Sequence, residues 1–168
     1  LLLTDKMIAN YDTNLKVNPP LRSEADRAAL LQALQDGTID AIATDHAPHA
    51  PDEKDVEFDQ APFGIIGLES ALPVLLDRLV QKKIITLNRL VELLSTNPAR
   101  ILRLKNKGHL RVGADADLTL IQLQKKHTLD VSRFASRSRN CPFAGWSVKG
   151  MAVMTIVGGR IIYSTLPQ

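Results

Sequence analysis

Carboxylate and imidazole side chains follow one another closely where a short apolar run of the chain ends. The run Ile39–Ala43 predicts a buried strand, and it leads directly into Asp45, His46 and His49. Carboxylate oxygens and imidazole nitrogens are ligands for a zinc-like ion, and a carboxylate beside a bound water can accept its proton. The segment therefore favours a hydrolytic metal site, with Asp45 as the first residue beyond the core.

This segment is too short to complete such a site. A catalytic zinc site needs three protein ligands and an open position, whereas adjacent side chains on an extended segment point to opposite faces. At least one of the two histidines therefore has another role. The residues also leave open that Asp45 is a structural carboxylate and that His49 is a surface imidazole satisfied by its neighbours.

Helix and strand patterns around this segment predict an α/β repeat. Ser23 and Asp26 have the spacing of a capping box, and Asp36 with Gly37 ends the predicted helix just before the apolar run. A helix followed by a buried strand is the order in which an α/β barrel closes, and catalytic groups of such barrels lie at the carboxyl ends of the strands. The site would then lie at the mouth of a barrel.

Two further loops are candidates for the same site. Asn18 precedes two prolines that hold the backbone extended, although its residue type alone indicates a cap or turn. An acidic loop such as the one between His46 and Pro62 is usually solvated surface. Because this loop follows Asp45, it is also a candidate for the rim or lid of the site. Gly64 and Gly67 do not match a P-loop, and they indicate exposed backbone N–H groups near a ligand or a tight turn.

The pattern changes near residue 104. A helix is predicted over residues 68–80, Thr86 caps another, and Asn97 is the expected N-cap of a third. Beyond residue 104, period-two alternation and glycine turns predict a small β unit with a hairpin at residues 157–161. We therefore divide the chain into residues 1–104 and 105–168.

Composition excludes several classes of function. The chain has 168 residues, 45% of them hydrophobic and 23% charged, which is typical of a globular protein. The net charge of +3 is mild, and the basic residues 133–139 lack interleaved aromatic side chains, which argues against a nucleic-acid partner. The single Cys141 excludes an intrachain disulfide and fits a reducing, cytoplasmic compartment. No apolar run approaches the roughly 20 residues of a membrane span.

Five motifs together resemble bacterial dihydroorotases of the longer type, in the amidohydrolase superfamily. They are Asn18-Pro19-Pro20-Leu21-Arg22, Thr44-Asp45-His46-Ala47-Pro48-His49, Pro62-Phe63-Gly64 with Gly67-Leu68-Glu69, Asn97-Pro98-Ala99-Arg100, and Gly113-Ala114-Asp115-Ala116-Asp117-Leu118. The last two recur across the superfamily. The first two in combination are more specific, because related hydantoinases and allantoinases depart from them at the residue that matches His49.

The resemblance implies the C-terminal part of a (β/α)8 TIM barrel, over residues 1–104, followed by part of a small β-sandwich. It also implies a two-zinc centre and the reversible cyclisation of N-carbamoyl-L-aspartate to L-dihydroorotate in pyrimidine biosynthesis. Asp45 matches an aspartate that binds one metal and carries the proton. Asn18 and His49 match substrate-binding positions, and Phe63 and Gly64 match a loop that contacts the pyrimidine ring.

The resemblance places the remaining metal ligands upstream of this segment. The chain, which starts without methionine, is therefore expected to be a C-terminal portion that is inactive alone and holds zinc weakly or not at all. His109 and His127 are expected in surface or turn roles, and His46 is left to orient Asp45. The alternatives are a non-catalytic scaffold partner of aspartate transcarbamoylase, a hydantoinase-like or allantoinase-like enzyme, and a homodimer that covers exposed strands.

Overall fold

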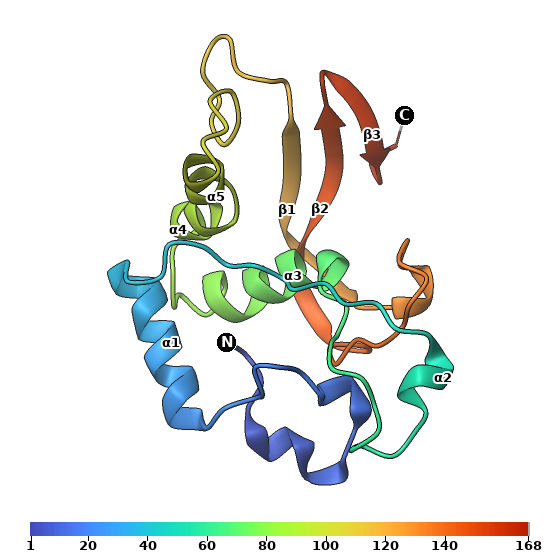
Figure 1. The fold of residues 1–168 in the computed structure, drawn as a ribbon. Helices are drawn as coiled ribbons and strands as arrows, with labels where there is room; N and C mark the ends of the chain where they lie inside the picture. Colours follow the sequence, from blue (N-terminus) through green and yellow to red (C-terminus); the bar gives the residue numbers. More distant parts are fainter. Residues whose placement is uncertain (168) are drawn as a thin grey trace. The chain divides into compact units, whose positions relative to one another are not determined.

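The computed structural model describes residues 1–167 (Figure 1). These residues form two compact units. Each unit combines segments that are far apart in the sequence. Unit 1 consists of Leu1–Thr38, Thr44–Ala71 and Thr128–Ser147, and unit 2 consists of Ile39–Ala43, Leu72–His127 and the chain from Val148 onward. Residues before and after position 104 are therefore mixed in unit 2, and a domain division at 104 stays a prediction.

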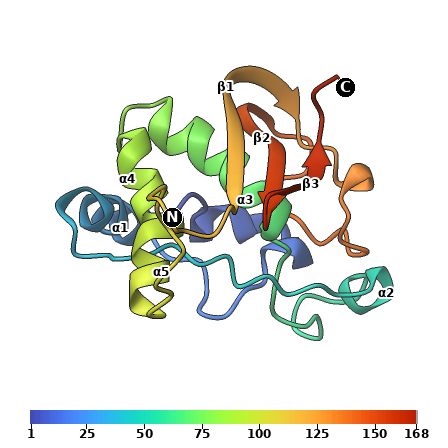
Figure 2. The same ribbon diagram turned by 90° about the horizontal axis from the view of Figure 1, so that it is seen from above.

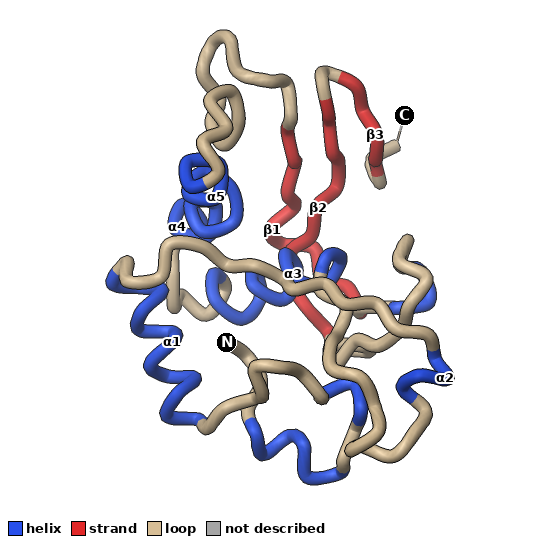
Figure 3. Tube along the Cα trace, in the orientation of Figure 1, coloured by secondary structure: helices blue, strands red, loops and turns tan. Residues whose placement is uncertain are grey.

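Unit 1 is built from short helices joined by long loops (Figure 3). Its helices are the 3-10 helices Asp5–Asn10, Thr13–Leu15 and Val131–Arg133, with α1 (Glu24–Asp36), α2 (Pro51–Lys54) and the start of α3 (Leu68–Leu75). The predicted capping box of α1 is confirmed, because Asp26 N donates to Ser23 Oγ at 3.2 Å and Ser23 N donates to the Asp26 carboxylate at 3.2 Å. Gly37, at φ 90°, ends the helix as expected.

The buried strand predicted at Ile39–Ala43 is not present. None of these five residues is buried, and the segment forms no ladder with any other part of residues 1–167. Its backbone is held instead by single contacts inside unit 2, such as the bond from Ile42 N to Leu93 O at 3.0 Å. A strand needs a hydrogen-bonded neighbour, and the described chain supplies none beside this segment.

Unit 2 contains most of the regular structure, and Figure 2 shows its helices and sheet from above. The predicted helix over residues 68–80 is confirmed as α3 and a π-helical continuation, Leu76–Val80. A second helical stretch comprises α4 (Leu87–Val91), a π-helical turn (Glu92–Thr96) and α5 (Asn97–Ile101). Their apolar faces form a core of fully buried side chains, chiefly Leu76, Leu79, Leu90 and Leu93.

Asn97 is not the N-cap that the sequence predicts. Thr86 does cap α4, since Arg89 N donates to its Oγ1 at 3.1 Å, but the backbone stays helical through Thr96 and Asn97. Pro98 is tolerated near the start of α5. The buried Asn97 side chain instead donates from Nδ2 to Asp40 O at 2.8 Å and so holds the segment Ile39–Ala43.

The three strands follow residue 104, as the alternation predicts. They are β1 (Leu118–Thr128), β2 (Ser147–Val157) and β3 (Arg160–Ser164), in the order β1-β2-β3. The predicted hairpin is confirmed, because β2 and β3 are antiparallel and Val157 pairs with Arg160. Gly158 and Gly159 both have positive φ, as a two-residue type I′ turn requires. None of the helices in residues 1–167 has the length and apolar character of a membrane span.

Candidate active site

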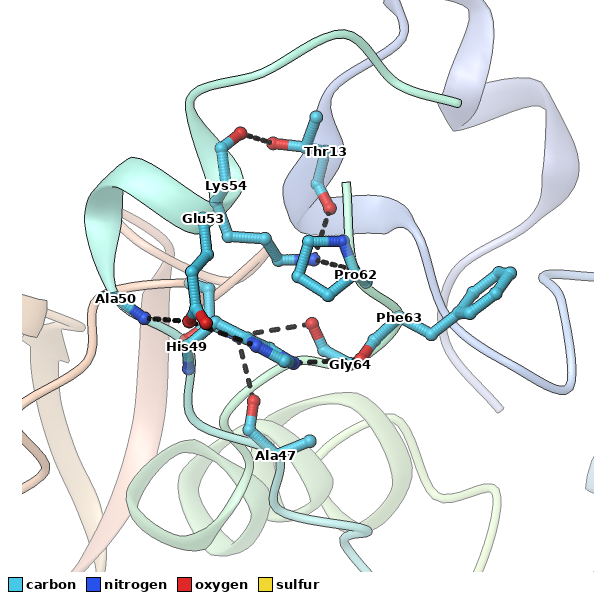
Figure 4. A network of polar contacts seen from close by, with 10 residues as sticks. Thr13, Ala47, His49, Ala50, Glu53, Lys54, Pro62, Phe63 and Gly64 are labelled. Carbon is cyan, nitrogen blue, oxygen red and sulfur yellow. Dashed lines mark hydrogen bonds and ion pairs between the residues drawn. The ribbon is translucent and has the colours of Figure 1, made fainter. Parts of the chain in front are cut away.

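Two loop segments of unit 1 lie side by side and bring most of the predicted site residues together. Ala47 N donates to Ile65 O at 2.9 Å, and His46 forms an isolated parallel bridge with Ile65. Figure 4 shows the result, with His49 of the first segment facing Phe63 and Gly64 of the second. The loop between the two segments therefore returns the chain to the carboxylate–histidine motif.

Asp45 stands exposed at the beginning of the first segment. Its φ of 46° is in the left-handed region, which aspartate tolerates better than most residues. No hydrogen bond or ion pair of its carboxylate is formed within residues 1–167, so no neighbour there gives it a structural role. The carboxylate is hydrated, so it is accessible to a ligand or a metal ion.

The imidazole of His49 is held from both sides. Its Nε2–H donates to Phe63 O at 2.9 Å, and its Nδ1 lies 3.4 Å from Glu53 Oε2. Glu53 itself is fixed at the start of α2, where its carboxylate accepts from Ala50 N at 2.8 Å. His49 is therefore hydrogen-bonded by its neighbours, which is the alternative that the sequence left open. Contact of His49 with a substrate stays a prediction.

The backbone of Phe63 and Gly64 is also engaged inside unit 1. Gly64 N donates to Lys16 O at 2.9 Å, and the Lys16 ammonium lies 4.9 Å from the centroid of the Phe63 ring. The ring is 56% exposed. Asn18 is exposed two residues after Lys16, so the contact with Gly64 holds the proline-rich loop near the second segment.

Gly64 cannot carry a side chain in this arrangement. Its φ is 126°, and a Cβ atom would lie 2.5 Å from the Cβ of Ala47 and 3.2 Å from His49 Nε2. We expect Gly64→Ala to separate the two segments and to lower the free energy of unfolding by about 2–4 kcal/mol, because strain at a positive φ adds to overpacking. Urea unfolding measures this effect.

Gly113→Ala is the matched control for that substitution. Gly113 also has a positive φ, 86°, but a Cβ atom there meets nothing within 4 Å. Gly113→Ala therefore reports backbone strain alone, and we expect a smaller loss of unfolding free energy, about 1–2 kcal/mol. Equal losses in both variants would mean that the close approach of Gly64 to Ala47 adds nothing to the cost of the substitution.

His46 has a role that sequence reasoning missed. Its Nδ1 accepts hydrogen bonds from Gly67 N at 3.1 Å and Leu68 N at 3.3 Å, so the ring caps the amino end of α3. An accepting Nδ1 is unprotonated, which places the proton of the neutral ring on Nε2. A signal was available, because the helix starting at Leu68 follows Ile65, Ile66 and Gly67, none of which has a capping side chain.

A buried lysine anchors the acidic loop, which the sequence suggested to be solvated. Lys54 is 7% exposed, and its Nζ donates to Thr13 O at 2.9 Å and Pro62 O at 2.8 Å (Figure 4). Thr13 Oγ1 donates in return to Lys54 O at 2.6 Å. Burial lowers the pKa of the Lys54 ammonium group, and the nearby charge of Lys16 lowers it further.

We expect Lys54→Met to destabilise the protein. Methionine keeps the apolar length of the side chain but leaves the carbonyl groups of Thr13 and Pro62 without their donor. Unpaired buried polar groups of this kind cost about 1–3 kcal/mol. Urea unfolding measures the change, with the exposed Lys82→Met as control. An unfolding free energy equal to that of the wild type would show that the two bonds have no net effect.

A cavity of about 290 Å³ lies beside this network. Its lining includes Asn14, His49, Lys54 and Arg139, but not Asp45. The cations that line it already have partners, because Lys54 Nζ and the Arg139 guanidinium donate to backbone carbonyl oxygens. Because Asp45 does not line it, the cavity is separate from the carboxylate that the sequence favours for chemistry.

The described residues do not form a metal centre. No group of three or more histidine, cysteine, aspartate or glutamate side chains gathers within residues 1–167, so Asp45 offers one ligand and no complete set. His109 has the predicted turn role, since its Nε2–H donates to Lys105 O at 3.0 Å and its Nδ1 accepts from Arg111 N. His127 lies within β1 with a half-buried side chain, so it is in the predicted β unit but not in a turn.

Comparison with known proteins identifies relatives along almost the whole chain. A family model described as the amidohydrolase family matches residues 3–162. A dihydroorotase of Desulforapulum autotrophicum is 58% identical over 161 residues, which cover 96% of this chain and 37% of that protein. A dihydroorotase of Brevibacillus brevis is 54% identical over 167 residues, covering 99% of this chain and 39% of its own length. The chain thus spans less than two fifths of these curated relatives.

Solved structures give the same picture at lower identity. The L-hydantoinase (dihydropyrimidinase) of Arthrobacter aurescens superimposes with a TM-score of 0.90 at 32% identity, over 98% of this chain and 38% of that protein. A D-hydantoinase of a Bacillus species, strain AR9, gives a TM-score of 0.89 at 27% identity, covering 98% and 38% of the two chains. The described fold therefore recurs within larger enzymes.

Proposed function

The chain belongs to the amidohydrolase family, with the α/β fold of that family, and on this premise we propose that it is the C-terminal part of a dihydroorotase. Residues 1–104 would complete a (β/α)8 barrel, and residues 105–168 would join a small β-sandwich. Identities of 51–58% to dihydroorotases support this function over that of the hydantoinases, which reach 32% at most among the structures compared above. The observation that carries the proposal is this identity to dihydroorotases, together with the accessible carboxylate of Asp45 beside the paired loop segments.

The proposed reaction opens the cyclic amide of L-dihydroorotate to N-carbamoyl-L-aspartate, and it closes the ring in reverse. Water adds to the amide carbonyl, the ring C–N bond breaks, and one proton must pass from the water to the departing nitrogen. A carboxylate that faces solvent and has no protein partner can accept this proton and return it. Asp45 is the residue of this chain that we assign to the transfer.

Zinc is the cofactor that we propose for the complete protein, with two ions as in the family that the sequence resembles. This chain would contribute Asp45 as one ligand, and the described residues offer no further ligands around it. Bound zinc supplies Lewis-acid polarisation of the carbonyl and an activated water. The part of the reaction that belongs to this chain is the proton transfer and the binding of substrate.

We assign substrate binding to Asn18, His49, Phe63 and Gly64. Contacts of the second segment with His49 and Lys16 support a shared surface on which these residues act together. An imidazolium at His49 can pair with the substrate carboxylate, and the Glu53 carboxylate at its Nδ1 is the group that the substrate would replace. The exposed ring of Phe63 offers an apolar face to the substrate ring.

The wider setting that we propose is a cytoplasmic enzyme of pyrimidine biosynthesis with a small-molecule substrate. The hypothesis includes two assemblies, which are a homodimer and a complex with aspartate transcarbamoylase. A purely scaffolding role is less well supported, because Asn18, Asp45 and His49, which match catalytic and substrate-binding positions of the family that the sequence resembles, are all present.

The deciding experiment assays the complete protein that contains this chain, loaded with zinc, against dihydroorotate, hydantoin and allantoin. We expect kcat/KM for dihydroorotate to exceed the other two by at least about 100-fold, because only a site built for its carboxylate pairs that charge. A preference for hydantoin or allantoin would identify a related cyclic-amide hydrolase. Absence of turnover with all three substrates would favour the scaffold.

A further inference from the structure

Asn140 is a buried amide that contacts both segments of the candidate site. It is 4% exposed and belongs to the third portion of unit 1, Thr128–Ser147. Its Nδ2 donates to Ala47 O at 2.9 Å and to Gly64 O at 3.2 Å, which are 93 and 76 residues away in the sequence. Both N–H groups of one planar amide are therefore used on two different segments.

The side-chain oxygen and the backbone oxygen of Asn140 accept hydrogen bonds from the same two segments. Its Oδ1 accepts from His49 N at 3.4 Å, and its backbone oxygen accepts from Ile66 N at 3.0 Å. The first segment is thus held on either side of Pro48, and the second is held at Gly64 and Ile66. A rigid amide between two carbonyl oxygens determines how far apart the two backbones lie.

The loop that carries Asn140 is itself fixed. Ala135 N and Ser136 N donate to the two carboxylate oxygens of Glu69 at 2.9 and 3.0 Å, which ties the loop to the first turn of α3. The Arg139 guanidinium donates to Ser138 O at 2.9 Å. Asn140 is therefore a rigid point of attachment.

We propose that Asn140 is a positioning residue for substrate binding, which sets the separation between the His49 segment and the Phe63–Gly64 segment. The inference rests on the proposed function, because these two segments carry the residues that we assign to the substrate. Asn140 does not touch the reacting atoms in this assignment. Its loss should therefore affect the binding of substrate more than the proton transfer at Asp45.

Two variants of the complete protein test this inference. Asn140→Ala removes all three side-chain bonds, and Asn140→Asp keeps the size but places a carboxylate oxygen against the oxygens of Ala47 and Gly64. We expect KM for dihydroorotate to rise about 10- to 100-fold in both variants, with kcat within about threefold. The exposed Asn88→Ala is the control and should leave both constants unchanged.

Amide hydrogen exchange distinguishes failure of this inference from failure of the proposed function. We expect faster exchange in residues 45–50 and 63–68 of both Asn140 variants, and unchanged exchange in Asn88→Ala. If the wild type does not turn over dihydroorotate, the proposed function fails, while the exchange rates still decide whether Asn140 holds the segments. Unchanged exchange, or an unchanged KM in an active and folded variant, overturns the inference.

Discussion

Replacing Asp45 by asparagine in the proposed complete dihydroorotase should lower kcat for ring opening by about 10²- to 10⁴-fold, the range in which a positioned acid–base group contributes. Asparagine has nearly the same size as aspartate, and it tolerates the left-handed φ of 46° equally well. The backbone of the motif is therefore preserved, while the group that accepts the proton is lost. Stopped-assay kinetics with the wild type and the variant measures the difference.

Asp52→Asn is the matched control for Asp45. Asp52 is an exposed carboxylate in α2, seven positions further along the chain, and the same chemical change there should leave kcat within about twofold. The thermal midpoints of both variants should equal that of the wild type. Turnover of Asp45→Asn close to the wild-type rate would remove Asp45 from the reaction and return it to a structural role.

The second expected result concerns the isolated chain of 168 residues. It should hydrolyse no dihydroorotate and should bind less than one zinc ion per molecule. The reason is the ligand count, since the described residues bring no group of three metal-binding side chains together. A site with one carboxylate does not reach the three protein ligands of a catalytic zinc site. Elemental analysis after gel filtration and a turnover assay with added zinc measure the two quantities.

The complete protein is the positive control for the isolated chain. It should bind zinc in stoichiometric amounts and hydrolyse dihydroorotate under identical conditions. Stoichiometric zinc together with turnover by the isolated chain would refute the assignment of the chain as one portion of the enzyme. Light scattering of the isolated chain, recorded on the same sample, reports whether it forms the homodimer named among the alternatives.

Local signals in the sequence predicted local structure well. The capping box at Ser23 and Asp26, the helix over residues 68–80 and the glycine hairpin after β2 are all present. Each of these features depends on residues within a few positions of one another, so the local sequence is sufficient to predict it. Strand formation at Ile39–Ala43 failed for the opposite reason, because a strand also depends on a neighbour elsewhere in the chain.

The candidate site was predictable in its chemistry but not in its framework. The motif identified Asp45 and His49, and the structure places His49 against Phe63 and leaves Asp45 free within residues 1–167. Lys54 and Asn140, by contrast, carry no motif, and their importance comes from contacts with residues 41 and 93 positions away. Sequence reasoning assigns such polar residues to solvent, since burial of a lysine or asparagine requires partners that only the folded chain provides.

The two ends of Phe63 have separate consequences for how this enzyme family can diversify. The carbonyl group of Phe63 receives the hydrogen bond of His49, whereas its phenyl group is largely exposed and meets the Lys16 ammonium. Under the proposed contact of Phe63 with the substrate ring, exchange of the side chain would alter the surface offered to that ring without breaking the backbone contact that orients the histidine. New substrate preferences would then arise at this position at little cost to the framework, which makes residue 63 the first choice for saturation mutagenesis.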